Sequence, residues 1–171
     1  AVSCWYEVHL SGPEFNVAGA GYAGVPGIVF GRNETLAWGV TNNICSQRDI
    51  YQEQENPERP DWFRFGDGWE KAETAVEEIT VKDNRTVKLD IVRTRNGPIV
   101  TDLLPDALKD TGPVTVKWVG ASHGDEITCM FDLAAASDCD TAREALKPWV
   151  VPTWSYVFGD VNGQIGYQAC G

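Results

Sequence analysis

The chain has 171 residues, of which 43% are hydrophobic and 23% charged, as in an ordinary globular domain. Its formal net charge of −11 comes without any cluster of Lys and Arg, which argues against a nucleic-acid partner because phosphate binding needs a basic surface. No run of about 18 apolar residues occurs, so no membrane contact is expected. No basic, apolar leader is visible at Ala1, although a mature or trimmed chain would look the same.

Short strands dominate the first third of the chain. Apolar and polar residues alternate over Ser3–Leu10, and the glycine-rich segment Asn16–Asn33 is typical of a strand, a loop and a second strand. The apolar run Ile28–Phe30, the polar turn Gly31–Glu34 and the run Thr35–Val40 together predict a β-hairpin.

The middle of the chain continues the same pattern. A strand is expected at Asp49–Gln54, a polar, proline-broken loop at Glu55–Asp61, and a hairpin over Trp62–Lys71. Four more strands follow, the first three as a meander: Glu77–Lys82, Thr86–Arg95, Gly97–Leu103 and Val114–Ala121.

Helices are scarce and fall late in the chain. A short helix is expected at Ile127–Ala136 and another at Thr141–Leu146, where Thr141 and Glu144 have the spacing of a capping box. The strands Ser155–Asp160 and Ile165–Cys170 flank an Asn-Gly turn, which is a strong hairpin signal. Many antiparallel strands with one or two helices predict an all-β or α+β protein, here a single domain over residues 1–171.

The residues alone single out no catalytic centre. The five cysteines form no C-x-x-C pair and suit buried free thiols or one or two disulfides, with Cys129 and Cys139 spaced to close a small loop. Two histidines, His9 and His123, do not suggest a zinc site, and no G-x-S-x-G elbow is present. Seven tryptophans suit either a core or a ligand pocket, so a non-catalytic, aromatic-rich β-module that binds carbohydrate or another small ligand is an open alternative.

A series of motifs is more specific than any single residue. The motifs, in chain order, are WYEVHL (Trp5–Leu10), Phe15–Glu53, RTRNGPIV (Arg93–Val100), VKWVGAS (Val116–Ser122) and VPTWSYVFGDVNGQIGY (Val151–Tyr167). In order and rough spacing, they resemble the penicillin acylase (penicillin amidase) family, the N-terminal nucleophile hydrolases that include penicillin, cephalosporin and acyl-homoserine-lactone acylases. The resemblance covers nearly the whole chain.

The resemblance implies an α+β fold dominated by antiparallel sheet, a partial version of the family's αββα sandwich. It implies cleavage of N-acyl amides, such as penicillin and cephalosporin side chains or acyl-homoserine lactones, through an acyl-enzyme on an N-terminal Ser, Thr or Cys. That nucleophile is expected upstream of Ala1 and a second oxyanion donor beyond Gly171, with Ser3 and Cys4 as ordinary strand residues. The chain is therefore expected to be a fragment of the large (β) chain or a natural short paralogue, and to be inactive without the small chain and the rest of the large chain. A periplasmic or extracellular location is expected.

Site residues follow from the same resemblance. In the family's Trp-Gly-x-Thr-x stretch, a backbone N–H lies in the oxyanion hole, and the matching position is Asn42, just after Thr41. The apolar wall of the acyl pocket would include Phe30, Val40, Trp118 and Trp154, with Thr41 beside it; Trp154 replaces a residue that is often smaller.

A structural calcium ion is also implied, although no cofactor is required for the reaction. Its ligands here would be the Asp49 carboxylate and the carbonyl oxygen of Arg48. Ser46 stands where the family usually has a first Asp, which puts the ion in doubt because Ca²⁺ usually takes several oxygens and more than one carboxylate. Asn96 and Ser155 also depart from the common His and Asn and indicate a divergent member.

Overall fold

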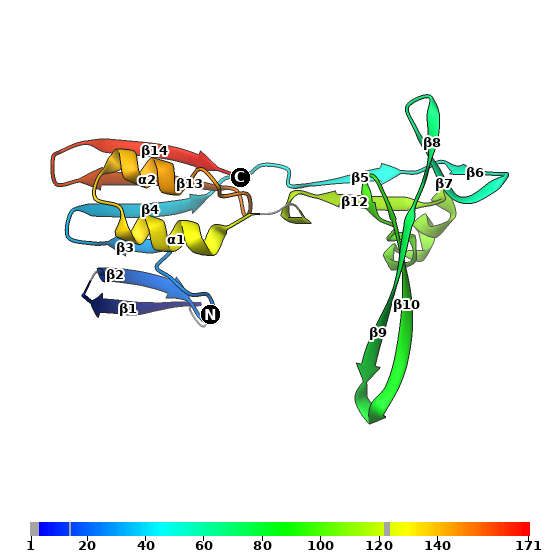
Figure 1. Ribbon diagram of the computed structural model, residues 1–171, viewed down its shortest axis with the longest axis horizontal. Coiled ribbons are helices and arrows are strands. Elements are labelled where there is room, and N and C mark those ends of the chain that lie inside the picture. Colours follow the sequence, from blue (N-terminus) through cyan, green and yellow to red (C-terminus); the bar gives the residue numbers. More distant parts are fainter. Residues whose placement is uncertain (1–3, 14, 122–123) are drawn as a thin grey trace. The chain divides into compact units, whose positions relative to one another are not determined.

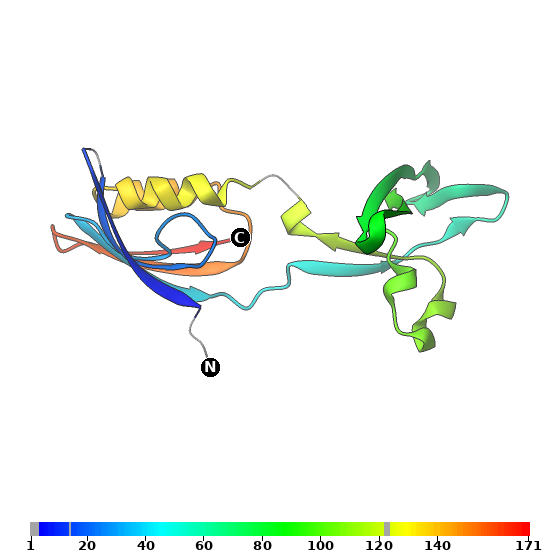
Figure 2. The same ribbon diagram turned by 90° about the horizontal axis from the view of Figure 1, so that it is seen from below.

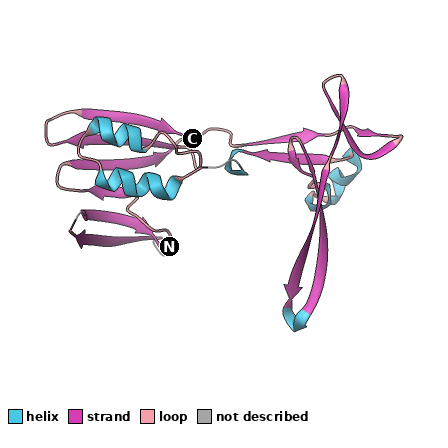
Figure 3. Cartoon of the chain, in the orientation of Figure 1, coloured by secondary structure: helices cyan, strands magenta, loops and turns pink. Residues whose placement is uncertain are grey.

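The computed structural model describes residues 4–13, 15–121 and 124–171, with Phe15 by its backbone alone. Contacts divide the chain into two compact units, residues 1–47 with 122–171 and residues 48–121, and each is described by itself. The single domain over residues 1–171 stays a prediction. Strands predominate in both units (Figure 3). In the part of the chain that is described, neither α-helix is long and apolar enough to cross a membrane.

The first unit is built on one six-stranded antiparallel sheet with the order β1-β2-β3-β4-β13-β14 (Figure 1). Strands β4 and β13 are far apart in the sequence but pair directly, with Trp38 opposite Phe158 and Val40 opposite Tyr156. The strands are β1 (Trp5–Gly12), β2 (Phe15–Tyr22), β3 (Phe30–Arg32), β4 (Leu36–Asn42), β13 (Trp154–Asp160) and β14 (Ile165–Cys170).

Two helices, α1 (Glu126–Ala135) and α2 (Cys139–Ala145), cover one face of this sheet (Figure 2). Side chains alternate between the faces of a strand, so every second residue of β4 and β13 points at the helices. Tyr156 and Leu133 are fully buried at 0% exposure, and Trp38 is 5% exposed. The unit therefore has a hydrophobic core of its own between the sheet and the helix layer.

The sequence predicted both helices but misplaced the start of the second. Asp138, not Thr141, is the N-cap of α2: its carboxylate accepts from the Thr141 N–H at 2.8 Å. The Thr141 hydroxyl reaches back to the Asp138 N–H at 3.1 Å, which completes a capping box three residues before the predicted one. An Asp is at least as good an N-cap as a Thr, so both spacings were chemically reasonable.

Asn33 fixes the turn that leads into β4. Its side-chain oxygen accepts from the N–H groups of Thr35 and Leu36, and its side-chain nitrogen donates to the carbonyls of Ala134 and Ala136 at the end of α1. The turn lies at residues 33–35, slightly later than the predicted Gly31–Glu34, and β4 begins where this asparagine anchors it to the helix.

The second unit consists of hairpins and small sheets with few buried residues. Its sheets are β11-β10-β9, β12-β5 and β6-β7-β8, and all the pairs that they form are antiparallel. The strands are β5 (Arg48–Gln52), β6 (Glu55–Asn56), β7 (Arg59–Phe65), β8 (Gly68–Lys71), β9 (Glu73–Val81), β10 (Arg85–Thr94), β11 (Gly97–Pro98) and β12 (Val114–Trp118). Four short 3₁₀ helices lie between strands or after the last strand of this unit: Lys82–Asn84, Thr101–Leu103, Asp106–Thr111 and Val119–Ala121.

Two predictions in this unit were wrong. The expected loop Glu55–Asp61 contains the hairpin β6-β7, whose turn Asn56 closes by accepting from the N–H groups of Glu58 and Arg59. The expected strand Gly97–Leu103 ends after two residues and gives way to a 3₁₀ turn. In both places, side-chain hydrogen bonds and prolines, rather than apolar alternation, decide the local structure.

The closing hairpin was predicted correctly. Gly163 has a positive φ of 81°, and the Asp160 carboxylate accepts from the N–H groups of Asn162 and Gln164. Antiparallel sheets with two short helices make the chain an α+β protein. The four-layer αββα arrangement stays a prediction.

Candidate functional site

The backbone N–H and C=O groups of Asn42 point away from β13. Asn43 donates its N–H to the carbonyl of Thr153 at 3.0 Å, and the register pairs the preceding residue, Asn42, with Trp154. Antiparallel pairs alternate between hydrogen-bonded and non-hydrogen-bonded positions, so the N–H of Asn42 projects from the opposite edge of β4. On that edge, β3 pairs with β4 only at Trp38 and Ala37, and no described strand pairs at the level of Asn42.

The side chain of Asn42 holds this end of β4 in place. The Trp154 indole nitrogen donates to its side-chain oxygen at 3.0 Å, and the Thr153 hydroxyl donates to the carbonyl of Asn43 at 2.6 Å. These bonds add to the β4-β13 ladder at the point where the strand ends. The backbone donor is therefore held on a rigid element, the condition for a preorganised electrostatic site. Nothing in the motif series predicts the bond between Trp154 and Asn42.

The predicted pocket residues of the first unit lie on two faces of the sheet. The register places Val40, Asn42 and Trp154 on the face that the helices cover, and Trp154 is only 7% exposed in the core. Thr41 lies on the open face, opposite Ser155. Phe30 packs edge-on against Trp5, which itself stacks on Tyr22, with ring centroids 4.5 and 3.9 Å apart. These residues do not line one common pocket.

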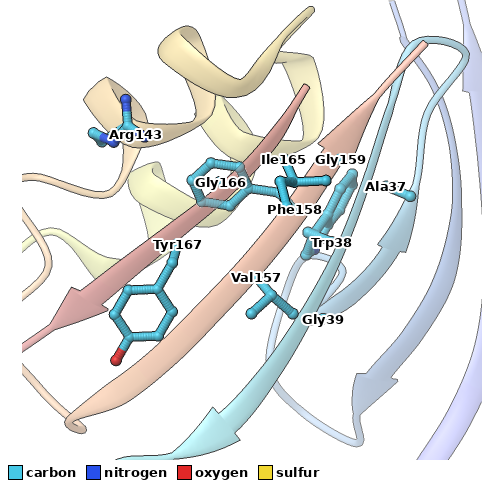
Figure 4. Close-up of a pocket in the computed structure, with 10 residues that line it drawn as sticks. All are labelled: Ala37, Trp38, Gly39, Arg143, Val157, Phe158, Gly159, Ile165, Gly166 and Tyr167. Carbon is cyan, nitrogen blue, oxygen red and sulfur yellow. The ribbon is translucent and has the colours of Figure 1, made fainter. Parts of the chain in front are cut away.

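The open face carries a shallow apolar depression of about 740 Å³ over β4, β13 and β14 (Figure 4). Val157, Ile165 and Tyr167 are 55%, 89% and 58% exposed there, although all three are large and apolar or aromatic. A second depression of about 640 Å³ adjoins Phe30 and Ala37. Such a surface can hold an apolar group or a further layer of protein, and it offers few polar atoms for orienting a ligand.

Trp118, Arg48 and Asp49 belong to the second unit. Trp118 pairs in register with Arg48, and its indole, 46% exposed, lies against Gly120, where a Cβ would collide with it. Asp49 is exposed and pairs with Lys117.

The described residues do not fit a calcium site on their own. Across residues 4–13, 15–121 and 124–171, no group of three or more His, Cys, Asp or Glu side chains could hold a metal ion. Asp49 supplies one carboxylate, and Ca²⁺ takes six to eight oxygen ligands. The ion stays a prediction that would need ligands from outside this chain.

Glu53, which no motif singles out, is only 9% exposed in the second unit. Its Oε1 accepts from the hydroxyls of Thr94 and Thr115, at 2.8 and 2.9 Å, and from the Asn96 amide at 3.1 Å. One carboxylate, from the residue that follows β5, thus connects this strand end to β10, β12 and the turn before β11. The alternating pattern that predicted a strand here could not show that this carboxylate points inward.

The buried thiols do not have the environment of reactive cysteines. All five cysteines are free, so the disulfides that the sequence left open are not formed, and Cys129, Cys139 and Cys170 are buried. Burial raises the pKa of Cys129 to about 11 and the pKa of Cys170 to about 11, so both are neutral thiols at pH 7. A reactive cysteine needs the opposite shift.

Comparison with known proteins agrees with the motif series. The chain is 29% identical to penicillin G acylase of Escherichia coli and 28% identical to the acyl-homoserine lactone acylase QuiP of Pseudomonas aeruginosa, covering 97% and 99% of this chain. It spans only 19% and 21% of the lengths of those two relatives.

A solved structure gives the same result. A thermostable penicillin G acylase from Alcaligenes faecalis matches with a TM-score of 0.78 and 27% identity over 98% of this chain and 30% of that one. The penicillin amidase family matches all of residues 1–171. The chain therefore belongs to the penicillin amidase family.

Proposed function

We propose that this chain is part of an acylase that hydrolyses N-acyl amides through an acyl-enzyme. The observation that carries the proposal is the direction of the Asn42 N–H at the unpaired edge of β4, in the Trp-Gly-Val-Thr-Asn stretch that resembles the family's oxyanion loop. Relatives named for cleaving penicillin G and acyl-homoserine lactones support amide hydrolysis as the reaction.

In this proposal the nucleophile comes from the acylase outside residues 1–171. Its N-terminal hydroxyl or thiol attacks the amide carbonyl carbon while the chain's α-amino group takes the proton. The C–N bond then breaks, the protonated amine leaves, and water hydrolyses the acyl-enzyme to the free acid. The Asn42 N–H donates to the oxygen that becomes negative in each tetrahedral intermediate. A preorganised donor of this kind accelerates acyl transfer by about 10²–10³-fold.

The remaining parts of the proposal concern partners and location. The chain spans about a fifth of its relatives, one of which is named a proenzyme, so we propose that a small chain and the rest of the large chain complete the site. A periplasmic or extracellular location, and inactivity of residues 1–171 alone, belong to the same proposal. The acyl group would lie against apolar side chains, for which the open sheet face is the candidate in the first unit.

The test compares the full-length acylase with residues 1–171, using a phenylacetyl amide reporter and an acyl-homoserine lactone. The full-length enzyme should release amine and acid from these amides, with a burst of amine wherever deacylation of the acyl-enzyme is the slower step, and residues 1–171 should release none. Failure of the full-length enzyme on both amides would contradict the proposal, and so would turnover by residues 1–171. Specific binding to a glycan array in the absence of amide cleavage would instead favour the carbohydrate-binding alternative.

A further inference from the structure

The β9-β10 hairpin of the second unit has two chemically different faces. Its register places Ile79 opposite Val87, and Leu89 lies on the same face two residues further along β10. The same face also carries four charged residues: Glu77 opposite Leu89, Arg85 opposite Val81, and the end pair Glu73 and Arg93. We call this surface the apolar ribbon face after its six aliphatic residues, Ala75, Ile79, Val81, Val87, Leu89 and Ile91.

The opposite face is mostly polar. Glu78 lies opposite Lys88, and their side chains form an ion pair of 3.0 Å. Thr80 lies opposite Thr86, and Val76 lies opposite Asp90. An antiparallel strand pair that is mostly polar on one face and mostly aliphatic on the other is typical of a sheet with one solvated and one buried face. The pattern thus predicts burial of the apolar ribbon face.

That burial is missing within the described chain. Ile79, Val87 and Leu89 are 47%, 47% and 48% exposed, and β9 and β10 contact mainly each other and β11. Figure 1 shows the two strands as a long twisted ribbon that extends away from the neighbouring strands of its unit. A two-stranded ribbon is at best marginally stable in water, so this one needs a surface that covers its apolar side.

We propose that the apolar ribbon face is an internal interface of the acylase, covered by an apolar surface from the part of the protein outside residues 1–171. This inference rests on the proposed function. The chain spans 19–21% of its relatives in length, which leaves about four-fifths of such a protein to supply the cover. A second copy of this chain is the poorer occupant, because each copy brings a formal charge of −11 and like-charged surfaces repel.

Photo-crosslinking in the full-length acylase tests the interface without relying on activity. The crosslinking amino acid p-benzoylphenylalanine is introduced at Leu89, or at Val76 as a matched control on the polar face with similar exposure, 48% against 55%. We expect position 89 to crosslink to peptides outside residues 1–171 of the same molecule, at least tenfold more than position 76. Equal yields, no crosslink at 89, or crosslinks only to another copy would overturn the proposal.

Amide hydrogen exchange gives an independent reading. Leu89→Ser should speed exchange of the β9 and β10 amides in the full-length acylase at least tenfold, and Val76→Ser should leave it nearly unchanged. Equal effects of the two substitutions would contradict a covered face. Crosslinks and exchange are measured without substrate, so the two proposals can fail separately. If the enzyme hydrolyses amides but fails both tests, only the proposed interface is contradicted. If it is inactive but passes both tests, only the proposed reaction is contradicted.

Discussion

The two units keep their shape by different means. In the first, helices α1 and α2 seal one sheet face, and Leu133, Ala142 and Tyr156 are completely buried. In the second, few side chains are buried, and one of them is the charged Glu53 with its three hydrogen bonds. Apolar burial thus organises the unit that carries Asn42, whereas backbone pairing and a polar network organise the other. The proposed covering of the apolar ribbon face would therefore contribute more to the stability of the second unit than to that of the first.

The largest effect should come from the core of the first unit. Leu133→Ala, at a residue with 0% exposure, should lower the free energy of unfolding by about 3 kcal/mol, because it removes buried methyl groups and leaves a cavity. Phe131→Ala on the same helix, where the ring is 41% exposed, should cost clearly less. Amide hydrogen exchange in β4 and β13 measures the effect of each substitution on the first unit. If Leu133→Ala speeds exchange in β5 and β12 by the same factor, the two units unfold together and the contrast between them is wrong.

A smaller effect is expected at Glu53. Glu53→Ala should cost about 2 kcal/mol, because Thr94, Thr115 and Asn96 lose their acceptor in a poorly hydrated place. Glu53→Gln keeps one acceptor oxygen and should cost less. Exchange of the β5 and β12 amides reports on this unit. If Glu53→Ala and Glu53→Gln speed exchange equally, the acceptor oxygen of residue 53 does not stabilise these strands.

The smallest effect is the pH dependence at Glu126 in the first turn of α1. Burial raises the pKa of this carboxyl, but the N–H groups of Val150 and Val151 donate to Oε1 at 3.0 and 2.9 Å, and the net pKa is lowered. A lowered folded-state pKa gives stability that is complete above the ordinary value of 4.5 and is lost as the pH falls through the folded value.

Glu126→Gln should therefore destabilise the protein at pH 7 by less than about 1 kcal/mol, because solvent screens this partly exposed group. The difference in unfolding free energy between the unsubstituted protein and the Gln variant should shrink as the pH falls below 4.5. Thermal unfolding of both proteins at pH 7 and pH 3.5 measures this difference. A difference that grows in acid would show that the carboxylate is not held by the two N–H groups.

Much of the fold could be predicted because local chemistry determined it. The hairpin β13-β14 follows from its Asn-Gly turn, and α1 lies within one residue of its expected range, Ile127–Ala136. The errors arose where a side chain decides the backbone: Asp138 caps α2, and Asn56 turns the expected loop into a hairpin. Hydrogen bonds from short polar side chains to the backbone compete with regular secondary structure. A single sequence does not show which of the possible side-chain bonds will form.

The site was predictable only in part, for a different reason. The motif series placed Asn42, and the register then gave its N–H a direction. The face on which a strand side chain lies depends on long-range pairing, so the resemblance alone could not separate Thr41 from Val40, or show that Trp154 is in the core. Glu53 was missed because an inward-facing carboxylate looks the same in sequence as a solvated one.

The most direct measurement compares Asn42→Pro with Asn42→Ala in the full-length acylase. Both substitutions remove the bond from Trp154, but only proline removes the backbone N–H, and proline is tolerated at a strand edge where that N–H faces outward. We predict that kcat of the proline variant falls about 10²–10³-fold below that of the alanine variant, with similar KM and unchanged amide exchange in β13. Equal kcat values in two folded variants would contradict the role of this backbone donor.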